Sequence, residues 1–219
     1  MSYSYQELVE KDIQYIWHPF TQMKDYETDE PMIIDKGEGV YLWDAKGNKY
    51  IDGISSWWVN TLGHCNARIN KAITRQIEKI EHVLLAGFSH QPAIELAEKL
   101  VQITPDKLTR VFFSDNGSTA VEVALKMSYQ YWFQKDKPEK RKFVALKNAY
   151  HGDTIGAVSV SGTDLFHKVY KPLLFDIHQA ESPYCYRCPM GLERSSCNIE
   201  CFSSLEDIVK ENHQEIAGI

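Results

Sequence analysis

No run of apolar residues in this sequence approaches the ~20 that a bilayer-spanning helix needs. There is also no block of basic residues, and 24 lysines and arginines stand against 30 aspartates and glutamates, a net charge of −6. That balance gives no electrostatic reason to expect a nucleic-acid partner. The N-terminus lacks the basic start and apolar core of a signal peptide. We therefore expect a cytoplasmic protein with neither a membrane nor a nucleic acid as its partner.

Cysteine is scarce, with five in 219 residues, too few for a disulfide scaffold at this size. Four of them lie close together: Cys185, Cys188, Cys197 and Cys201. Thiolates at short paired spacings can close around tetrahedral zinc, although the inner gap of eight residues is shorter than common zinc-finger spacings. A structural zinc site and reduced thiols in an intracellular loop both stay open, and we expect no zinc. The fifth cysteine, Cys65, is expected to be a small buried residue.

What is present is an ordinary globular composition, with 43% hydrophobic and 25% charged residues. Residues 32–51 place apolar segments on either side of the turn Asp44-Ala-Lys-Gly-Asn48, which predicts a small antiparallel meander. After residue 66, helical periodicity alternates with short apolar runs, a pattern typical of an α/β domain with a largely parallel sheet. Strands are expected at residues 109–113, 142–146 and 172–175. Helices are expected to begin near residues 66, 92 and 120, and a further helix at the capping box formed by Ser203 and Glu206. The apolar run 155–160 fits either a helix or a strand.

The last residues, 215–219, look like the opening of a further strand. A parallel strand left unpaired at a chain end is unfavourable, because its edge is exposed. We therefore expect this chain to be the N-terminal part of a longer protein.

A candidate phosphate site lies at Ser114-Asp-Asn-Gly-Ser-Thr119, between an expected strand and an expected helix. Gly117 allows a ligand to approach the backbone, and Ser118 supplies a hydroxyl where a helix presents free N–H groups and its positive dipole end. An ordinary capped helix start would use the same residues.

Two aromatic segments are further candidates. Tyr150 and His151 follow an expected strand, where open α/β sheets place ligand groups, but packing of this loop on the domain is an equal alternative. Trp57 and Trp58 are adjacent, so in an extended segment they could not both face one core. One of them is expected to form a surface or pocket wall, with oligomer-interface packing as the alternative.

Together these pieces resemble the class III pyridoxal-phosphate aminotransferases. The matching stretches run in the family's order over nearly the whole chain: Gly39-Val-Tyr-Leu-Trp-Asp44, Gly47-Asn-Lys-Tyr-Ile-Asp52, Leu62-Gly-His64, Phe113-Ser-Asp-Asn-Gly-Ser118 with Glu122 and Ala124, and Tyr150-His-Gly152 with Gly156 and Ser159. Three further stretches most resemble the biotin-pathway branch of the family: Trp17-His-Pro-Phe-Thr-Gln-Met23, Ser55-Ser-Trp-Trp58 and Lys126-Met-x3-Tyr131-Trp132.

The resemblance implies roles for individual residues. Gly117 and Ser118 match contacts to the phosphate of pyridoxal 5'-phosphate. Tyr150 matches the aromatic residue stacked on the cofactor ring, and is expected to contact substrate too, with His151 beside it. The substrate-binding residues implied are Trp57, Trp58, which supports the same wall, and Phe20. Phe20 stands where adenosylmethionine-using members carry a tyrosine, so the amino donor, adenosylmethionine or lysine, stays open.

The resemblance also implies the fold and the reaction. The fold is α/β, the N-terminal portion of a fold-type I transferase, with an arm and meander over 1–62 and an incomplete large cofactor-binding domain over 63–219. The reaction implied is transfer of an amino group to 8-amino-7-oxononanoate by a homodimer. No lysine here matches the family's Schiff-base lysine, so no catalytic residue is assigned and the chain alone is expected to be inactive. The alternatives are another class III ω-aminotransferase and a non-catalytic metal-binding or assembly module.

Overall fold

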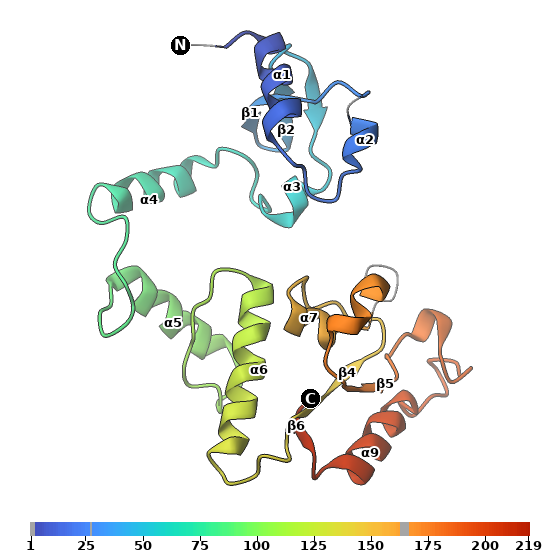
Figure 1. Ribbon diagram of the computed structural model, residues 1–219. Coiled ribbons are helices and arrows are strands. Elements are labelled where there is room, and N and C mark those ends of the chain that lie inside the picture. The colour runs from blue at the N-terminus through green and yellow to red at the C-terminus, as the bar shows by residue number, and fades with distance from the viewer. Residues whose placement is uncertain (1–2, 27, 163–166) are drawn as a thin grey trace. The chain divides into compact units, whose positions relative to one another are not determined.

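The computed structural model describes residues 3–26, 28–162 and 167–219, and the chain divides into two compact units (Figure 1). Unit 1 is Met1–Leu96 and unit 2 is Ala97–Ile219. This division by contacts falls later in the chain than the domain boundary expected after residue 62, which stays a prediction. Within the described ranges, no helix is long and apolar enough to cross a membrane.

Unit 1 contains the predicted antiparallel meander. Its three strands pair in the order β1-β2-β3: β1 (Ile34–Glu38), β2 (Tyr41–Asp44) and β3 (Lys49–Ile51). The buried carboxylate of Asp44 shapes the β2–β3 turn, since its Oδ1 accepts the amides of Lys46 at 3.0 Å and Asn48 at 2.8 Å. Its Oδ2 accepts the Tyr50 hydroxyl at 2.9 Å. The predicted turn between β2 and β3 is therefore held by hydrogen bonds to the Asp44 side chain.

Helices precede and follow the meander in unit 1. They are α1 (Tyr5–Tyr15), α2 (Met23–Tyr26), the single turn α3 (Ser55–Trp58), α4 (Ala67–Ile77) and α5 (Gln91–Ile103), which continues into unit 2. The first of these has a reciprocal capping box between Ser4 and Glu7. Asn66 caps α4 by accepting the amides of Arg68 and Ile69 at 3.1 and 3.3 Å. The helices expected from residues 66 and 92 are thus confirmed.

Unit 2 is built on a parallel sheet in the order β5-β4-β6. Its strands are β4 (Lys142–Leu146), β5 (His178–Ala180) and β6 (Ile216–Gly218). One face of β4 presents Phe143 and Ala145 to α6 (Gly117–Phe133), and the other presents Val144 to α9 (Cys201–Asn212) (Figure 1). A central strand covered on both faces reads as a continuous apolar run. The α/β fold with a parallel sheet is confirmed.

Several local predictions were wrong. Residues 109–113 form no strand, because no described strand lies beside them to complete a ladder, and Phe112 is 65% exposed. Residues 172–175 run through the 3₁₀ helix η1 (Lys168–Leu173), and the strand begins later, at β5. Ser203 lies inside α9 and donates to the carbonyl of Glu200, so it caps nothing. Cys65 is exposed at a positive φ of 52°.

Candidate functional site

The N-terminus of α6 has its own polar scaffold. Asn116 caps the helix by accepting the Thr119 amide at 3.0 Å, while the Thr119 hydroxyl accepts the Asn116 amide at 3.2 Å. The same hydroxyl donates to the Asp115 carboxylate at 2.6 Å, and this bond holds the pKa of Asp115 below its usual value. The reciprocal bonds keep the loop before the helix in one conformation.

This scaffold leaves the first two helical amides, of Gly117 and Ser118, pointing out of the helix. Residues in those positions have no intrahelical acceptor, and the positive end of the helix dipole lies at the same place. Outside the adjacent residues and the backbone of α6 itself, no atom of the described residues lies within 4 Å of the point where a Cβ on Gly117 would stand. The helix start therefore presents N–H donors to open space, which is the arrangement that binds a phosphate.

The loop that follows β4 packs directly on this helix start. Gly152, at φ +119°, lies so close to Ser118 that a Cβ on the glycine would stand 1.9 Å from the Ser118 hydroxyl. The loop is fastened by the His151 amide, which donates to the Ser161 hydroxyl at 3.0 Å. Farther along, Glu122 of α6 accepts the amide of Gly156, in α7 (Ile155–Ser159), at 2.8 Å. Three contacts thus set the position of the loop over the end of α6.

Tyr150 is the aromatic group of this loop. Its ring is exposed, and its hydroxyl donates to the Asp153 carboxylate at 2.6 Å. That hydrogen bond, with burial as a smaller cause, raises the pKa of Tyr150, so the phenol stays protonated. Asp153 was not among the residues expected from sequence, although its position three residues after the tyrosine, with a turn-forming glycine between them, was a usable signal.

One open cavity of about 740 Å³ joins these pieces. All four residues predicted to hold a cofactor line it: Gly117, Ser118, Tyr150 and His151. Thr154 lines it too, and its buried hydroxyl finds no hydrogen-bond partner within the described part of the chain. Free amides, a serine hydroxyl, an orphaned threonine hydroxyl and a phenol ring suit a ligand with a phosphate and an aromatic ring.

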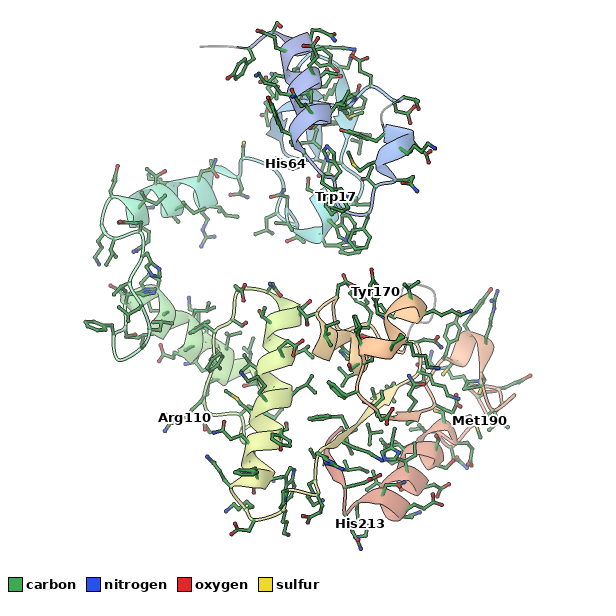
Figure 2. All side chains as sticks on the ribbon, viewed as in Figure 1. Trp17, His64, Arg110, Tyr170, Met190 and His213 are labelled. Carbon is green, nitrogen blue, oxygen red and sulfur yellow. The ribbon has the colours of Figure 1, made fainter. Side chains whose placement is uncertain are left out.

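Three of the four predicted substrate residues, Phe20, Trp57 and Trp58, lie together in unit 1, whereas Tyr150 belongs to unit 2. The rings of Phe20 and Trp57 are 5.4 Å apart between centroids, and those of Trp57 and Trp58 meet edge-on at 6.2 Å. All three are well exposed, at 76%, 53% and 72%. They form a continuous exposed aromatic surface, which we call the aromatic wall. Trp17, another exposed aromatic residue near the start of unit 1, is labelled in Figure 2.

The two tryptophans of the wall are carried by an unusual backbone. Ser55, Ser56, Trp57 and Trp58, which make up α3, all have positive φ, between 47° and 68°. Ser56 and Trp57 have ψ values of 58° and 47°, so the segment is a left-handed helical turn. Each such residue costs about 1–2 kcal/mol relative to the right-handed form. Strain of this kind persists where surrounding contacts enforce it, and it is concentrated at functional sites.

The four cysteines of the candidate zinc loop are unpaired in the structure. Cys185, in the 3₁₀ helix η2 (Cys185–Arg187), is exposed, while Cys188, Cys197 and Cys201 are half-buried. Among the described residues, no group of three or more His, Cys, Asp or Glu side chains could hold a metal ion.

We expect elemental analysis of protein purified without added metal to find no stoichiometric zinc, because structural zinc needs four ligands at once. One zinc per chain, lost on changing Cys188 and Cys197 to serine, would contradict this.

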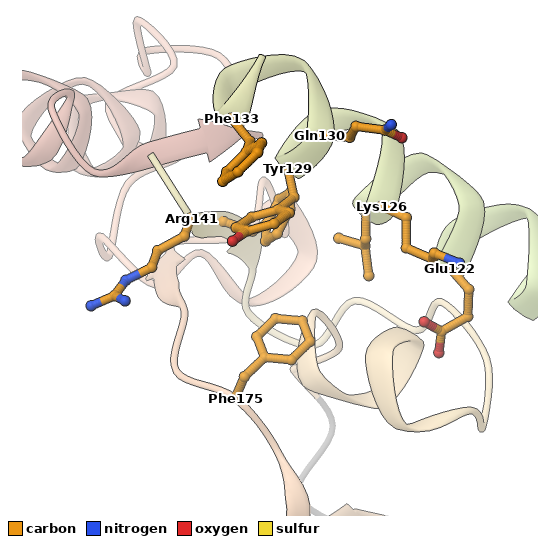
Figure 3. A pocket seen from close by; sticks show the side chains of 9 residues that line it. Glu122, Lys126, Tyr129, Gln130, Phe133, Arg141 and Phe175 are labelled. Atoms are coloured by element: carbon orange, nitrogen blue, oxygen red, sulfur yellow. The ribbon is translucent and has the colours of Figure 1, made fainter. Parts of the chain in front are cut away.

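A second cavity, of about 460 Å³, lies in unit 2 against α6 (Figure 3). Tyr129, Phe133 and Phe175 give it a largely apolar lining, with Glu122, Lys126 and Arg141 at its margins. It holds none of the predicted site residues and no convergent set of polar groups. We interpret it as exposed apolar surface of the domain.

Comparison with known proteins places these sites in a family. The model of the family described as Aminotransferase class-III matches residues 23–219. Adenosylmethionine-8-amino-7-oxononanoate aminotransferase of Geobacter sulfurreducens is 49% identical over 218 residues, 99% of this chain and 48% of the relative. The chain therefore spans about half the length of the curated relatives it matches.

Solved structures of aminotransferases are similar to this chain in both fold and sequence. The crystal structure of adenosylmethionine-8-amino-7-oxononanoate aminotransferase from Methanocaldococcus jannaschii superposes with a TM-score of 0.86 at 43% identity, covering 98% of this chain and 46% of that one. An omega transaminase from Pseudomonas jessenii, solved in complex with PMP, superposes at 0.85 with 33% identity, covering 95% and 47%.

Proposed function

The chain belongs to the class III aminotransferase family, and we propose that it forms the cofactor-phosphate cup and the substrate wall of an enzyme that transfers an amino group to 8-amino-7-oxononanoate, giving 7,8-diaminononanoate. The observation that carries the proposal is the cavity that joins the first-turn amides of α6 to Tyr150 and His151. The names of relatives whose sequences are 49% and 50% identical to this chain support the choice of substrate.

The residues of the cavity fit pyridoxal 5'-phosphate. The Gly117 and Ser118 amides and the Ser118 hydroxyl would bind the phosphate, and the Thr154 hydroxyl is a further free donor. The Tyr150 ring would cover the cofactor ring, with its orientation held by Asp153. When bound, this cofactor supplies an electron sink for the carbon that gives up or receives the amino group. The chain's own part is to bind, orient and shield that group.

The aromatic wall would pack against the aliphatic chain of the keto substrate. Phe20 can stack on a flat donor such as an adenine, but it has no hydroxyl. A hydrogen bond through such a hydroxyl is worth ~0.5–1.5 kcal/mol, too little to decide by itself between adenosylmethionine and lysine as the donor. We propose that the donor is selected by other residues, and that the enzyme works as a homodimer in which exposed aromatic surface is covered.

The cup can be tested with Gly117→Val in an enzyme of the relatives' full length. Among the described residues outside the helix's own backbone and the adjacent positions, no atom lies within 4 Å of a Cβ at Gly117, so the fold should tolerate a side chain there, and the valine would fill the space above the amides. Losing charge-assisted bonds worth ~1.5–3 kcal/mol should weaken pyridoxal-phosphate binding roughly 10- to 100-fold. Absorbance titration measures the affinity, and Ala120→Val, at an exposed residue farther along α6, is the matched control. Equal affinities in the two variants would refute the assignment.

The substrate is tested by half-reactions. Enzyme loaded with pyridoxamine phosphate should give up its amino group to 8-amino-7-oxononanoate. Enzyme loaded with pyridoxal phosphate should accept an amino group from adenosylmethionine or lysine, which this half-reaction distinguishes as donors, and not from ornithine or 4-aminobutyrate. Turnover of ornithine or 4-aminobutyrate without the keto substrate would instead support another ω-aminotransferase of the same class.

A further inference from the structure

A buried carboxylate lies beneath the aromatic wall. Asp52 follows β3, and its side chain is 6% exposed. Its Oδ2 accepts two hydrogen bonds, from the Ser56 hydroxyl at 2.7 Å and from Nε2 of His64 at 2.8 Å. One carboxylate oxygen therefore joins the left-handed turn α3 to a histidine eight residues farther along the chain.

His64 is itself fixed to the meander (labelled in Figure 2). Its amide donates to the Gly39 carbonyl at 2.8 Å, and its carbonyl accepts the Gly39 amide at 3.1 Å. Its ring lies so close to β1 that a Cβ on Gly37 would stand 2.8 Å from the histidine Cγ. Gly63, at φ +83°, lets the chain approach Gly39 closely enough for this pairing. The position of the imidazole is thus fixed by the meander, and the imidazole in turn holds the Asp52 carboxylate by a hydrogen bond.

The turn that Asp52 and His64 hold is α3, whose backbone is strained. Four successive left-handed residues are unfavourable for L-amino acids, so α3 needs contacts from outside the turn to persist. Ser56 is the member of the turn that reaches the Asp52 carboxylate through its side chain. The two residues that follow it are Trp57 and Trp58, whose edge-on rings continue the contact to Phe20.

We propose that Asp52 and His64 are positioning residues: their hydrogen bonds hold the left-handed turn through Ser56, and so aim Trp57 and Trp58 as the wall against which the chain of the keto substrate packs. This rests on the function proposed above. Both side chains are largely buried, 6% exposed for Asp52 and 13% for His64, so the pair sets how tightly the keto substrate is held rather than the rate of amino transfer.

The electrostatics of the pair agree with this role. Hydrogen bonds from the Ser56 amide and hydroxyl, and then from His64, lower the pKa of Asp52 to about 2. The carboxylate therefore stays ionised under working conditions and accepts both bonds at full strength.

Two matched pairs of variants isolate the contacts. Ser56→Ala removes the hydroxyl bond to Asp52 and keeps the Ser56 amide bond, whereas Ser55→Ala makes the same change one residue earlier, in the same turn, at φ 50° against 47°. The Ser55 hydroxyl makes no hydrogen bond in the described part of the chain. His64→Gln keeps an N–H donor at about the reach of Nε2, and His64→Met has a similar size without a donor.

The variants are made in an enzyme of the relatives' full length, and near-ultraviolet circular dichroism reports the orientation of the indoles below the unfolding temperature. Trp58→Phe identifies the contribution of the Trp57–Trp58 pair. We expect that contribution to be lost in Ser56→Ala and His64→Met and kept in Ser55→Ala and His64→Gln. KM for the keto substrate should rise roughly tenfold in the first two, with kcat within about twofold of wild type.

Equal spectra within each matched pair would overturn the proposal, and so would a changed spectrum with an unchanged KM or a loss confined to kcat. If the wild-type enzyme does not use 8-amino-7-oxononanoate, the proposed function fails, while the spectra still decide whether Asp52 and His64 hold the turn.

Discussion

Residues 1–219 expressed alone should aggregate and transfer no amino group. The chain exposes 17500 Å² of surface at a mass of 25.3 kDa. A folded monomer of that mass exposes about 10,000 Å², and two separate units sharing the mass about 12,000 Å². Many large apolar side chains are exposed, among them Phe112 and those of Tyr129, Phe133 and Phe175, which line the second cavity. Exposed apolar patches of this extent drive association.

Activity should be absent for a separate reason. In the function proposed above, the cup and the Tyr150 ring would hold the phosphate and cover one face of the cofactor, and the resemblance to the family implies that the lysine that carries the cofactor is not among the residues of this chain. Size-exclusion chromatography with and without pyridoxal phosphate, followed by a donor half-reaction, measures both expectations. Addition of a separately expressed partner covering the remaining length of the relatives is the positive control. A monodisperse 219-residue chain that turns over an amino donor would refute both.

Gly152→Ala should abolish the cofactor site. The new Cβ would stand 1.9 Å from the Ser118 hydroxyl, 2.7 Å from its Cβ and 3.1 Å from its Cα, at a φ of +119°. Rotating the serine removes the first clash and leaves the other two, so the loop that carries Tyr150 must move away from α6. We expect pyridoxal-phosphate affinity to fall more than about 100-fold, since phosphate and ring contacts are lost together. The melting temperature should fall by several degrees, because the change adds about 1–2 kcal/mol of backbone strain as well.

Gly191→Ala is the matched control for Gly152→Ala. Gly191 also has positive φ, +68°, but apart from its chain neighbours no atom in the described ranges lies within 4 Å of its Cβ position. It therefore carries the backbone penalty without the collision. Ser118→Gly combined with Gly152→Ala should restore part of the melting temperature, because the serine Cβ and hydroxyl are removed. If Gly152→Ala behaves like Gly191→Ala in both affinity and stability, the close packing of loop on helix is not what holds the site.

The sequence predicted best the features that depend on neighbouring residues. The β4 boundaries matched, because a strand buried on both faces is a continuous apolar run. The meander and the helices from residues 66 and 92 were confirmed, since turn chemistry and capping act within a few residues. The family motifs likewise pointed to Gly117, Ser118, Tyr150 and His151 before any geometry showed that they line one cavity.

Contacts between distant residues were decided by the tertiary structure alone. Residues 109–113 have strand composition, but a strand forms only beside a partner, and none lies there in the described chain. The left-handed turn at Ser55–Trp58 contains no glycine, so the sequence does not indicate it, and it depends on a carboxylate and on a histidine that pairs with Gly39. Composition and periodicity report local preference, whereas strain of this kind is maintained by side-chain contacts that form only in the folded structure, which a sequence read residue by residue does not contain.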